Sequence, residues 1–382
     1  MLTSTLCSDL EGLQAWCPAW DHLAAEIKLP FCSPSWMLGW WRHAAPSDAH
    51  LRVVLITDQG ELVAVAPFYV SPSRGLAHYR LLGAGTSMRL EPLARPGSEE
   101  IAASLVTATL REAEPCPDVI RLEGAPSKSP WPLLLQKHWP ASRPPWVHRD
   151  RFLPAPFLSL RGTSFEDWLA NKSANFRKQM RRDRRHLEEK GAIFKLVTNQ
   201  EDLKAGLADF AALHYARWSW RGGSRALTPH VERMLADVGR RHIDDRRFRL
   251  WLLQSGGKTI ATRIMIAAGG EVSAWNSGFD DAWAKSHPSL LTLLVAIEHA
   301  WEVGDDRMDL GGGGREYKYR FADGEESLQW LTLVPRGPRY RVTRLSLMPH
   351  HIKHSIARRL PEATKDRIRG WSSRSSTRQS RP

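Results

Sequence analysis

The sequence predicts an α/β protein with mixed sheets, built from two tandem halves. The main observation is an internal repeat: residues 51–69 read LRVVLITDQGELVAVAPFY, residues 248–266 read FRLWLLQSGGKTIATRIMI, and the segments align without a gap. Each has an apolar strand, a turn ending in Gly60 or Gly257, and a second apolar strand. Repeated supersecondary units indicate a duplicated architecture. Two unrelated hairpins can also look this similar, and the sequence alone leaves that alternative open.

Composition narrows the class of protein. At 382 residues the chain can form two domains with cores of their own, and 42% hydrophobic with 25% charged residues is typical of a globular protein. The net charge of +13 is concentrated at one end, because residues 336–382 hold thirteen Lys or Arg and two acids. The rest of the chain is nearly neutral, which argues against a folded body that binds nucleic acid.

Cysteine spacing and hydropathy bear on compartment. None of the four cysteines has C-x-x-C spacing, so we expect no zinc site, no other metal and no disulfide framework. The first residues lack the pattern of a signal peptide, and no run reaches the roughly 18 apolar residues of a membrane span. We therefore expect a cytoplasmic protein.

Local patterns divide the chain. The first half, residues 1–125, is expected to contain a helix over 34–45, the hairpin over 51–70, a strand over 79–82, a helix over 101–112 and a strand over 119–122. Eight prolines between 126 and 156 predict a connection without a central strand, with a short helix near 131–138.

The second half, residues 157–335, repeats the alternation. We expect helices over 165–170, 175–190, 201–218, 229–240 and 289–303, the hairpin over 248–268, and strands over 271–279, 307–310 and 328–334. Residues 336–382 form a basic tail, in which apolar residues from Leu345 to Leu360 recur at helical spacing. Such a helix either packs on the body or lies on an anionic membrane surface, and the polar end is expected to be disordered.

The stretch from 271 to 310 reads as strand, loop, helix, strand. This layout is typical of one half of an acyl-CoA-binding N-acyltransferase, in which two strands splay apart and the pyrophosphate rests at the start of the following helix. Here the helix start offers Lys285, His287, Ser289 and Leu290 as candidate cofactor contacts. Capping alone can explain the same residues.

A glycine run follows the last of these strands. Residues 309–320 read DLGGGGREYKYR, and four glycines allow the backbone to approach a ligand closely. We take Gly312, Gly313, Arg315 and Lys318 as cofactor-binding candidates. The alternative is a flexible turn.

At this point the chain resembles the CelD-like family of GNAT-type acyltransferases, often named for cellulose or exopolysaccharide biosynthesis. The resemblance covers about residues 30–335. The residues that carry it are Ser33-Pro34-x-Trp36-x-x-x-Trp40, Asn175 to Gly191, Leu213-His214-x-x-Arg217-Trp218, and Asp309-x-Gly311 with Tyr317-Lys318. It implies two tandem GNAT-like halves with the cofactor and catalytic elements in the second, a layout similar to that of Fem-type aminoacyltransferases.

This chain departs from the family pattern at two places. It has His287-Pro288-Ser289 where family members often read Ser-Pro-Gly, and residues 88–91 read MRLE where they often carry an acidic patch.

Acyl transfer from a thioester to an amine needs a proton donor for the thiolate and an acceptor for the amine proton. Tyr317 is the expected acid, and Glu316 or Asp309 the expected acceptor. A core role for Tyr317 and a capping role for Asp309 remain open.

Four further residues are expected at the substrate. His214 and Arg217 lie one turn apart on a helix and are expected to line the acceptor pocket, unless they are a surface pair. Trp275 and Asn276 lie on the strand that flanks the gap.

Three hypotheses follow. The first is an acyl-CoA-dependent N-acyltransferase that uses acetyl-CoA or a longer acyl-CoA on a small-molecule or glycan amine, with peripheral membrane contact through the tail. The second is a Fem-type transferase that uses aminoacyl-tRNA, motivated by the basic helix, whose residues 172–190 hold eight cations and three acids. The third is a non-catalytic binding module at a polysaccharide synthase.

Overall fold

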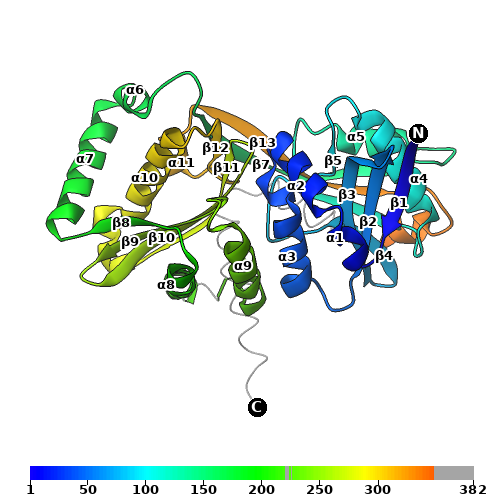
Figure 1. Cartoon of the computed structure of the whole chain (residues 1–382). Helices are drawn as coiled ribbons and strands as arrows, with labels where there is room; N and C mark the ends of the chain where they lie inside the picture. Colours follow the sequence, from blue (N-terminus) through cyan, green and yellow to red (C-terminus); the bar gives the residue numbers. More distant parts are fainter. Residues whose placement is uncertain (220–222, 225, 348–382) are drawn as a thin grey trace, which may run out of the picture.

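A computed structural model describes residues 1–219, 223–224 and 226–347. A single mixed sheet of thirteen strands runs through it, with helices packed on its faces (Figure 1). The strand order is β1-β2-β3-β4-β6-β13-β7-β12-β11-β10-β9-β8, with the short strand β5 paired to β3. The mixed α/β fold class is therefore confirmed.

The first part of the chain supplies the elements on the right of Figure 1. They are β1 (Leu2–Cys7), α1 (Glu11–Gln14), α2 (Cys17–Glu26), η1 (Pro30–Cys32), α3 (Pro34–Ala44), β2 (His50–Asp58), β3 (Glu61–Ser73), β4 (Leu76–Leu81), β5 (Leu93–Ala94), α4 (Glu99–Glu112), β6 (Val119–Pro126) and α5 (Trp131–Lys137).

The remainder supplies the centre and the left. It contains β7 (Trp146–Ser159), α6 (Phe165–Ala170), α7 (Ala174–Glu189), β8 (Ile193–Val197), α8 (Gln200–Ser219), α9 (Pro229–His242), β9 (Phe248–Ser255), β10 (Lys258–Ala268), β11 (Glu271–Phe279), η2 (Asp281–Ser286), α10 (Pro288–Glu302), β12 (Arg307–Asp309), α11 (Glu316–Tyr319) and β13 (Gly324–Val334).

The tandem halves are visible in the strand pairing. In the first half β1 to β4 pair antiparallel in order, α4 crosses over, and β6 returns parallel to β4. In the second half β8 to β11 pair antiparallel in order, α10 crosses over, and β12 returns parallel to β11. The two halves therefore share one topology, as the internal repeat predicted.

The repeat extends to an irregularity in each hairpin. In the first hairpin the register skips Val63, because Ile56 pairs with Ala64 and Thr57 with Leu62. In the second hairpin it skips Ile260. Val63 and Ile260 occupy the same position in the gap-free alignment of the two segments. A β-bulge at equivalent positions supports duplication over chance similarity.

The halves exchange their last strands. β7 follows the first half in sequence but pairs with β12, and β13 follows the second half but pairs with β6. β7 and β13 also pair with each other, so they join two sheets into one. A central strand in the proline-rich connection contradicts our expectation. Pro154 and Pro156 are tolerated because the backbone edge on which they lack an N–H points away from β13. Their carbonyls, on that same edge, accept hydrogen bonds from Gly313 N and Leu310 N.

Contacts between helices also join the halves. Gly39 of α3 lets α9 approach, since a Cβ there would lie 2.9 Å from Val238 Cγ2. Asp237 Oδ2 of α9 lies 3.5 Å from Arg42 Nη1 and 3.3 Å from His43 Nε2, both on α3. The main hydrophobic core accordingly contains residues from both halves.

The start of the tail packs on the body. Residues 340–347 are helical, and Leu347 is buried against Val119 and Val334. The rest of the predicted amphipathic helix, and the end expected to be disordered, lie outside the described residues.

Candidate active site

The strands β11 and β12 separate after a short parallel ladder. They pair only over Glu271–Ser273 and Arg307–Asp309. Beyond this point the chain after β12 follows β7, because Leu310 N donates to Pro156 O at 3.0 Å and Gly313 N to Pro154 O at 2.7 Å. β11 continues beside β10 as far as Phe279, with a bulge at Trp275. A slot therefore opens between the two strands.

Two adjoining cavities occupy this slot. One, of about 210 Å³, lies between the halves; its walls are Phe31, Thr86, Ser87, Met88, Arg263, Ala274, Trp275, Asn276, Ser277, Asp309, Leu310, Gly311, Gly312, Arg315, Tyr317 and Lys318. The other, of about 340 Å³, lies at the start of α10; its walls are Arg217, Trp218, Asn276, Ser277, Phe279, Ala284, His287, Pro288, Ser289, Leu290, Arg315 and Tyr317. We call them the inner cavity and the helix-start cavity. They share Asn276, Ser277, Arg315 and Tyr317, so they adjoin, and we refer to the two together as the channel.

The start of α10 is suited to an anion. His287 has a left-handed conformation (φ 49°), and its carbonyl accepts from Leu290 N at 3.0 Å and Leu291 N at 3.2 Å. Among the described residues, the Ser289 N–H has no acceptor. The first turn contains no acidic residue. A free amide and the positive end of the helix dipole both favour a negatively charged group here.

The His287 ring is part of the support for this helix start. Asp183 Oδ2 lies 2.9 Å from its Nδ1, and Gln179 Nε2 lies 3.3 Å from the same atom. Both residues come from α7, so the basic helix buttresses the loop before α10.

The equivalent position in the first half is different. The crossover helix α4 begins with Glu99 and Glu100, which would repel an anion. Residues after β4 also close the gap beside β6, since Arg89 N donates to Gly124 O at 2.8 Å. The two halves share a topology, but only the second has an open slot with a favourable helix start.

Lys318 holds the glycine loop. Its Nζ donates to Gly311 O at 2.6 Å and to Gly312 O at 2.9 Å, and only 6% of the residue is exposed. Burial lowers the pKa of Lys318 to about 8, although the nearby Asp309 carboxylate opposes this. The ammonium group is therefore directed at the protein backbone, and it fixes the turn that separates the strands.

Asp309 is joined to the first half by a buried ion pair. Arg89 Nε lies 2.9 Å from Asp309 Oδ2, and the two side chains are 5% and 3% exposed. Arg89 also lies 2.9 Å from Glu326 Oε2 on β13. Arg89 belongs to the segment at which this chain departs from the CelD-like pattern, and nothing in the sequence indicated its partners.

Tyr317 occupies the junction of the two cavities. It is half-buried on α11, and its hydroxyl makes no hydrogen bond to any residue in the described part of the chain. The Arg263 guanidinium lies close enough for an electrostatic interaction. Tyr317 therefore contributes to both cavity walls a hydroxyl that is available for a hydrogen bond.

The structure brings most of the predicted site residues together. Those that line the channel are Asp309, Tyr317, Gly312, Arg315, Lys318, Trp275, Asn276, Arg217, His287, Ser289 and Leu290. Trp275 turns its ring toward the first half, where Nε1 donates to Thr86 O at 3.0 Å. Asn276 accepts from Ser277 N at 2.8 Å.

Four predicted residues lie outside the channel walls. Glu316 and Lys285 are exposed, and Gly313 is engaged with β7 through its N–H. His214 is buried behind the walls, with Nε2 at 2.6 Å from Ser224 Oγ. Burial, reinforced by Arg217, lowers the pKa of His214 to about 4.

Sequence reasoning missed Arg263, Ser277 and the first-half wall formed by Phe31 and Thr86–Met88. The Ser33-Pro34-x-Trp36 motif was the only signal near that wall: Trp36 Nε1 donates to Ser87 Oγ at 2.5 Å.

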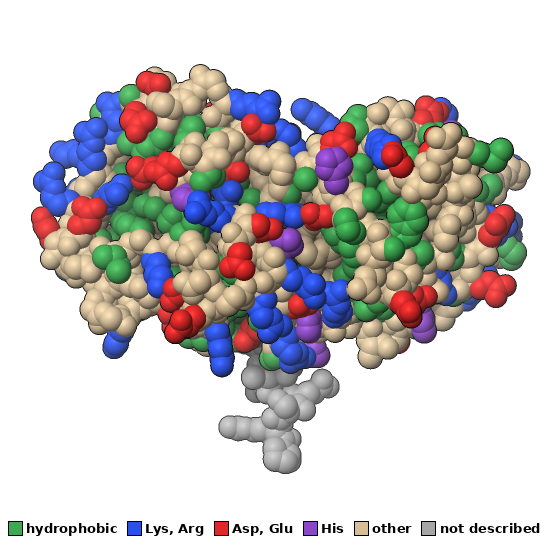
Figure 2. Space-filling model, in the orientation of Figure 1, with side chains coloured by type: hydrophobic (Ala, Val, Ile, Leu, Met, Phe, Trp, Pro, Cys, Tyr) green, Lys and Arg blue, Asp and Glu red, His purple; other side chains and the backbone are tan. Residues whose placement is uncertain are grey.

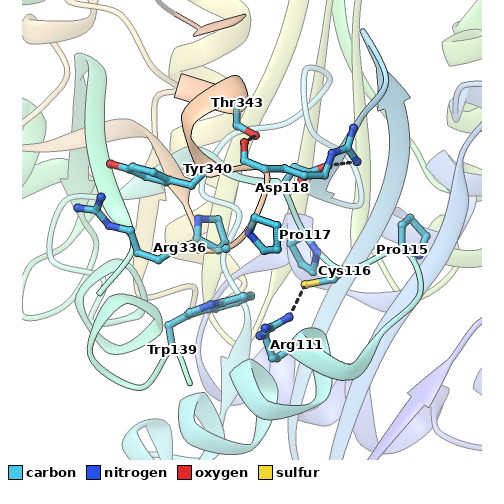
Figure 3. Close-up of a pocket in the computed structure, with 13 residues that line it drawn as sticks. Arg111, Pro115, Cys116, Pro117, Asp118, Trp139, Arg336, Tyr340 and Thr343 are labelled. Carbon is cyan, nitrogen blue, oxygen red and sulfur yellow. Dashed lines mark hydrogen bonds and ion pairs between the residues drawn. The ribbon is translucent and has the colours of Figure 1, made fainter. Parts of the chain in front are cut away.

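A further cavity, of about 280 Å³, lies in the first half (Figure 3). It is lined by the connection from α4 to β6 and by the chain after β13, with Arg111 Nη1 at 3.5 Å from Cys116 Sγ. It is therefore at the opposite end of β6 from the position that corresponds to the slot.

Comparison with known proteins agrees with this geometry. Residues 174–319 match the family described as the acetyltransferase (GNAT) domain. The second half therefore carries a GNAT domain, and the predicted enzyme class, a GNAT-type acyltransferase, is confirmed. No curated protein matches the chain.

Several solved structures share the fold across both halves. FemX is similar with a TM-score of 0.58 at 11% identity, over 81% of this chain and 93% of that one. A second structure is the C-terminal domain (DUF2156) of a protein assigned as a lysylphosphatidylglycerol synthetase from Agrobacterium fabrum. Its TM-score is 0.55 at 13% identity, and the match covers 87% of this chain and 94% of that one. L-PGS from Bacillus licheniformis has a TM-score of 0.51 at 13% identity, and the match covers 88% of this chain and 96% of that one. At these identities the likeness concerns the fold.

None of the helices in the described ranges combines the length and the hydropathy that a membrane crossing requires.

Proposed function

We propose that the protein is an acyl-CoA-dependent N-acyltransferase, most simply an acetyltransferase, acting on an amine. The observation that carries the proposal is the open slot between β11 and β12, which ends at a helix start with a free amide and no acid. The resemblance to CelD-like proteins supports an amino sugar or another exopolysaccharide-related amine as the acceptor. The third hypothesis, a non-catalytic module, would also have an open slot, and measured turnover of an acyl-CoA with an amine would rule it out.

The channel divides the work between its two cavities. The helix-start cavity fits the CoA phosphates, which would meet the Ser289 N–H, the helix dipole and the Arg217 and Arg315 side chains. The strand edge of β11 offers backbone groups to the pantetheine arm. The thioester would then lie at the inner cavity, beside Tyr317.

The residues at the junction support the chemistry. The amine nitrogen attacks the thioester carbon, the C–N bond forms and the C–S bond breaks. Tyr317 gives a proton to the departing sulfur, and the amine loses one. Asp309 lines the inner cavity and is our proposed acceptor of that proton through water. Its pairing with Arg89 makes it a weak base, so its larger contribution is to hold the loop. Glu316 would need to move inward to act.

Binding of the donor can be tested without knowing the acceptor. A ligand that binds only the folded state raises its apparent stability, so acyl-CoA esters of rising chain length should raise Tm. Ser289→Glu places a carboxylate in the first turn of α10 and should weaken CoA binding at least tenfold. The matched control is Ile101→Glu in the first turn of α4, at an exposed residue, which should leave binding unchanged. Absence of any shift with every ester would contradict the proposal.

A second candidate function uses aminoacyl-tRNA as the donor. It is favoured by an exposed row of cations on α7, formed by Lys178, Arg181 and Arg185 at helical spacing, and Figure 2 shows Lys and Arg along the edge over this helix. FemX and the L-PGS structure share the fold. Steeply salt-dependent tRNA binding, lost when these three cations are replaced by Glu, would favour this function over the first.

A further inference from the structure

One buried cation in the channel has no acidic partner. Arg263 on β10 lies opposite Ser277 of β11 and is 4% exposed. Its Nη2 donates to Ser289 O at 2.9 Å, while its buried Nε has no hydrogen-bond partner. Within the described residues, no carboxylate forms an ion pair with it.

Other buried arginines of this protein have the carboxylate partner that Arg263 lacks. Arg249 on β9 is 6% exposed and places both Nη atoms on Asp305, and Arg89 is paired with Asp309 and Glu326. A guanidinium remains charged in a protein, and a buried charge without a counterion is strongly unfavourable. An arginine kept in this state is suited to an anion that arrives from outside.

The surroundings of Arg263 reinforce this preference. It lines the inner cavity together with Lys318 and Arg315, and the only acid among the lining residues is Asp309, which is paired with Arg89. The wall thus has a net positive charge. The Nε atom that lacks a partner belongs to a side chain on this wall.

Arg263 lies between the inner cavity and the start of α10, where the CoA phosphates are assigned. Arg263 lines the inner cavity only, although its Nη2 also donates to Ser289 O at 2.9 Å and lies 3.4 Å from Ser289 Oγ in the wall of the helix-start cavity. The inner cavity also has the first-half wall and Tyr317, so it lies at the reacting end of the channel. An anion on the inner-cavity side of Arg263 would lie beside the reacting atoms, where the acceptor must bind.

We propose that Arg263 binds an anionic group, a carboxylate or a phosphate, carried by the amine acceptor. The acceptor is then an amino acid, a peptide with a nearby carboxylate, or a phosphorylated amino sugar, and a neutral amine is a poor substrate. This assignment to the acceptor rests on the proposed function. The anion site itself does not.

The anion site can be tested without turnover, by thermal unfolding of three proteins: wild type, Arg263→Met and Arg249→Met. In the absence of added anions, Arg263→Met should unfold at the same or a higher temperature, because an unpaired buried charge is removed. Arg249→Met should unfold several degrees lower, because Asp305 loses its partner. Acetate, glycine and phosphate should raise the Tm of wild type and of Arg249→Met but not that of Arg263→Met. Equal anion effects in all three proteins would overturn the proposal.

The acceptor assignment is tested with matched amines and acetyl-CoA. Glycine is compared with glycinamide, and glucosamine 6-phosphate with glucosamine. One charged member should have a kcat/KM at least tenfold above its neutral partner, which also identifies the anion as carboxylate or phosphate. Arg263→Met should abolish the preference, and Arg263→Lys should restore part of it.

Affinity for CoA, measured separately, should be the same in wild type and Arg263→Met. If CoA affinity falls tenfold in the variant, the anion is a phosphate of the donor and the assignment to the acceptor is wrong. If no CoA ester binds any variant while the anions still stabilise wild type through Arg263, the proposed function fails and the anion site stands.

Discussion

The ion pair between Arg89 and Asp309 provides the sharpest test of how the first half supports the site. The pair joins residues 220 positions apart, with Arg89 Nε 2.9 Å from Asp309 Oδ2 and both side chains at most 5% exposed. Asp309 directly precedes the glycine loop, and Arg89 also contacts Glu326. Loss of Arg89 should therefore destabilise the contact between the halves and the loop together.

The expected loss of unfolding free energy depends on which charged group loses its partner. Removing one partner of a buried pair costs about 3–5 kcal/mol, because the other charge remains buried without compensation. In Arg89→Met, Glu326 Oε2 still forms an ion pair with Arg307 Nη2 at 3.0 Å. Asp309 Oδ1 still accepts a hydrogen bond from Gly311 N at 3.2 Å. We therefore expect the lower end, about 3 kcal/mol. Against a total stability of about 5–15 kcal/mol, the variant should still fold.

A double-mutant cycle measures the pair in urea denaturation followed by tryptophan fluorescence. Asp309→Asn should also cost about 3 kcal/mol, and Arg89→Met combined with Asp309→Asn should cost at least 1.5 kcal/mol less than the sum of the single variants. The control is the exposed pair of Arg95 and Glu61, where Arg95→Met should cost less than about 1 kcal/mol. Additive effects, or a single-variant cost below about 1 kcal/mol, would refute the reasoning.

Three further predictions concern stability. Gly269→Ala should destabilise the protein by more than about 3 kcal/mol, since φ is +59° and a Cβ would lie 1.7 Å from Ala25 O, whereas Gly256→Ala, with φ +57° and open space, should cost only about 1–2 kcal/mol in the same denaturation assay. Burial lowers the pKa of Lys318 to about 8, so between pH 8 and about 10.5 the unfolded chain binds more protons than the folded chain. The free energy of unfolding should therefore rise with pH across this window, and Lys318→Met should lack the rise. The pKa of His214 is lowered to about 4, so stability should fall as pH drops from about 6.5 to 4; an equal loss in His214→Phe would contradict this.

Much of the second half could be predicted because its signals are local. The hairpins over 51–69 and 248–266 are specified by alternating apolar residues and glycine turns, and both recur in the structure with equivalent bulges. Residues 309–320 likewise indicated a loop at the end of a strand. Side chains one turn apart on a helix were harder to place: Arg217 lines the channel, while His214 is buried behind it.

Other features depended on residues that are far apart in the chain. By itself, the sequence determined the duplicated α/β halves, the crossover helix at the slot and the glycine loop, because each follows from periodicity or backbone chemistry within a few residues. Tertiary structure alone decided the exchange of β7 and β13, the partners of Arg89 and the solitary charge of Arg263. Ion pairing and desolvation depend on distances across the folded chain, and no local pattern encodes them.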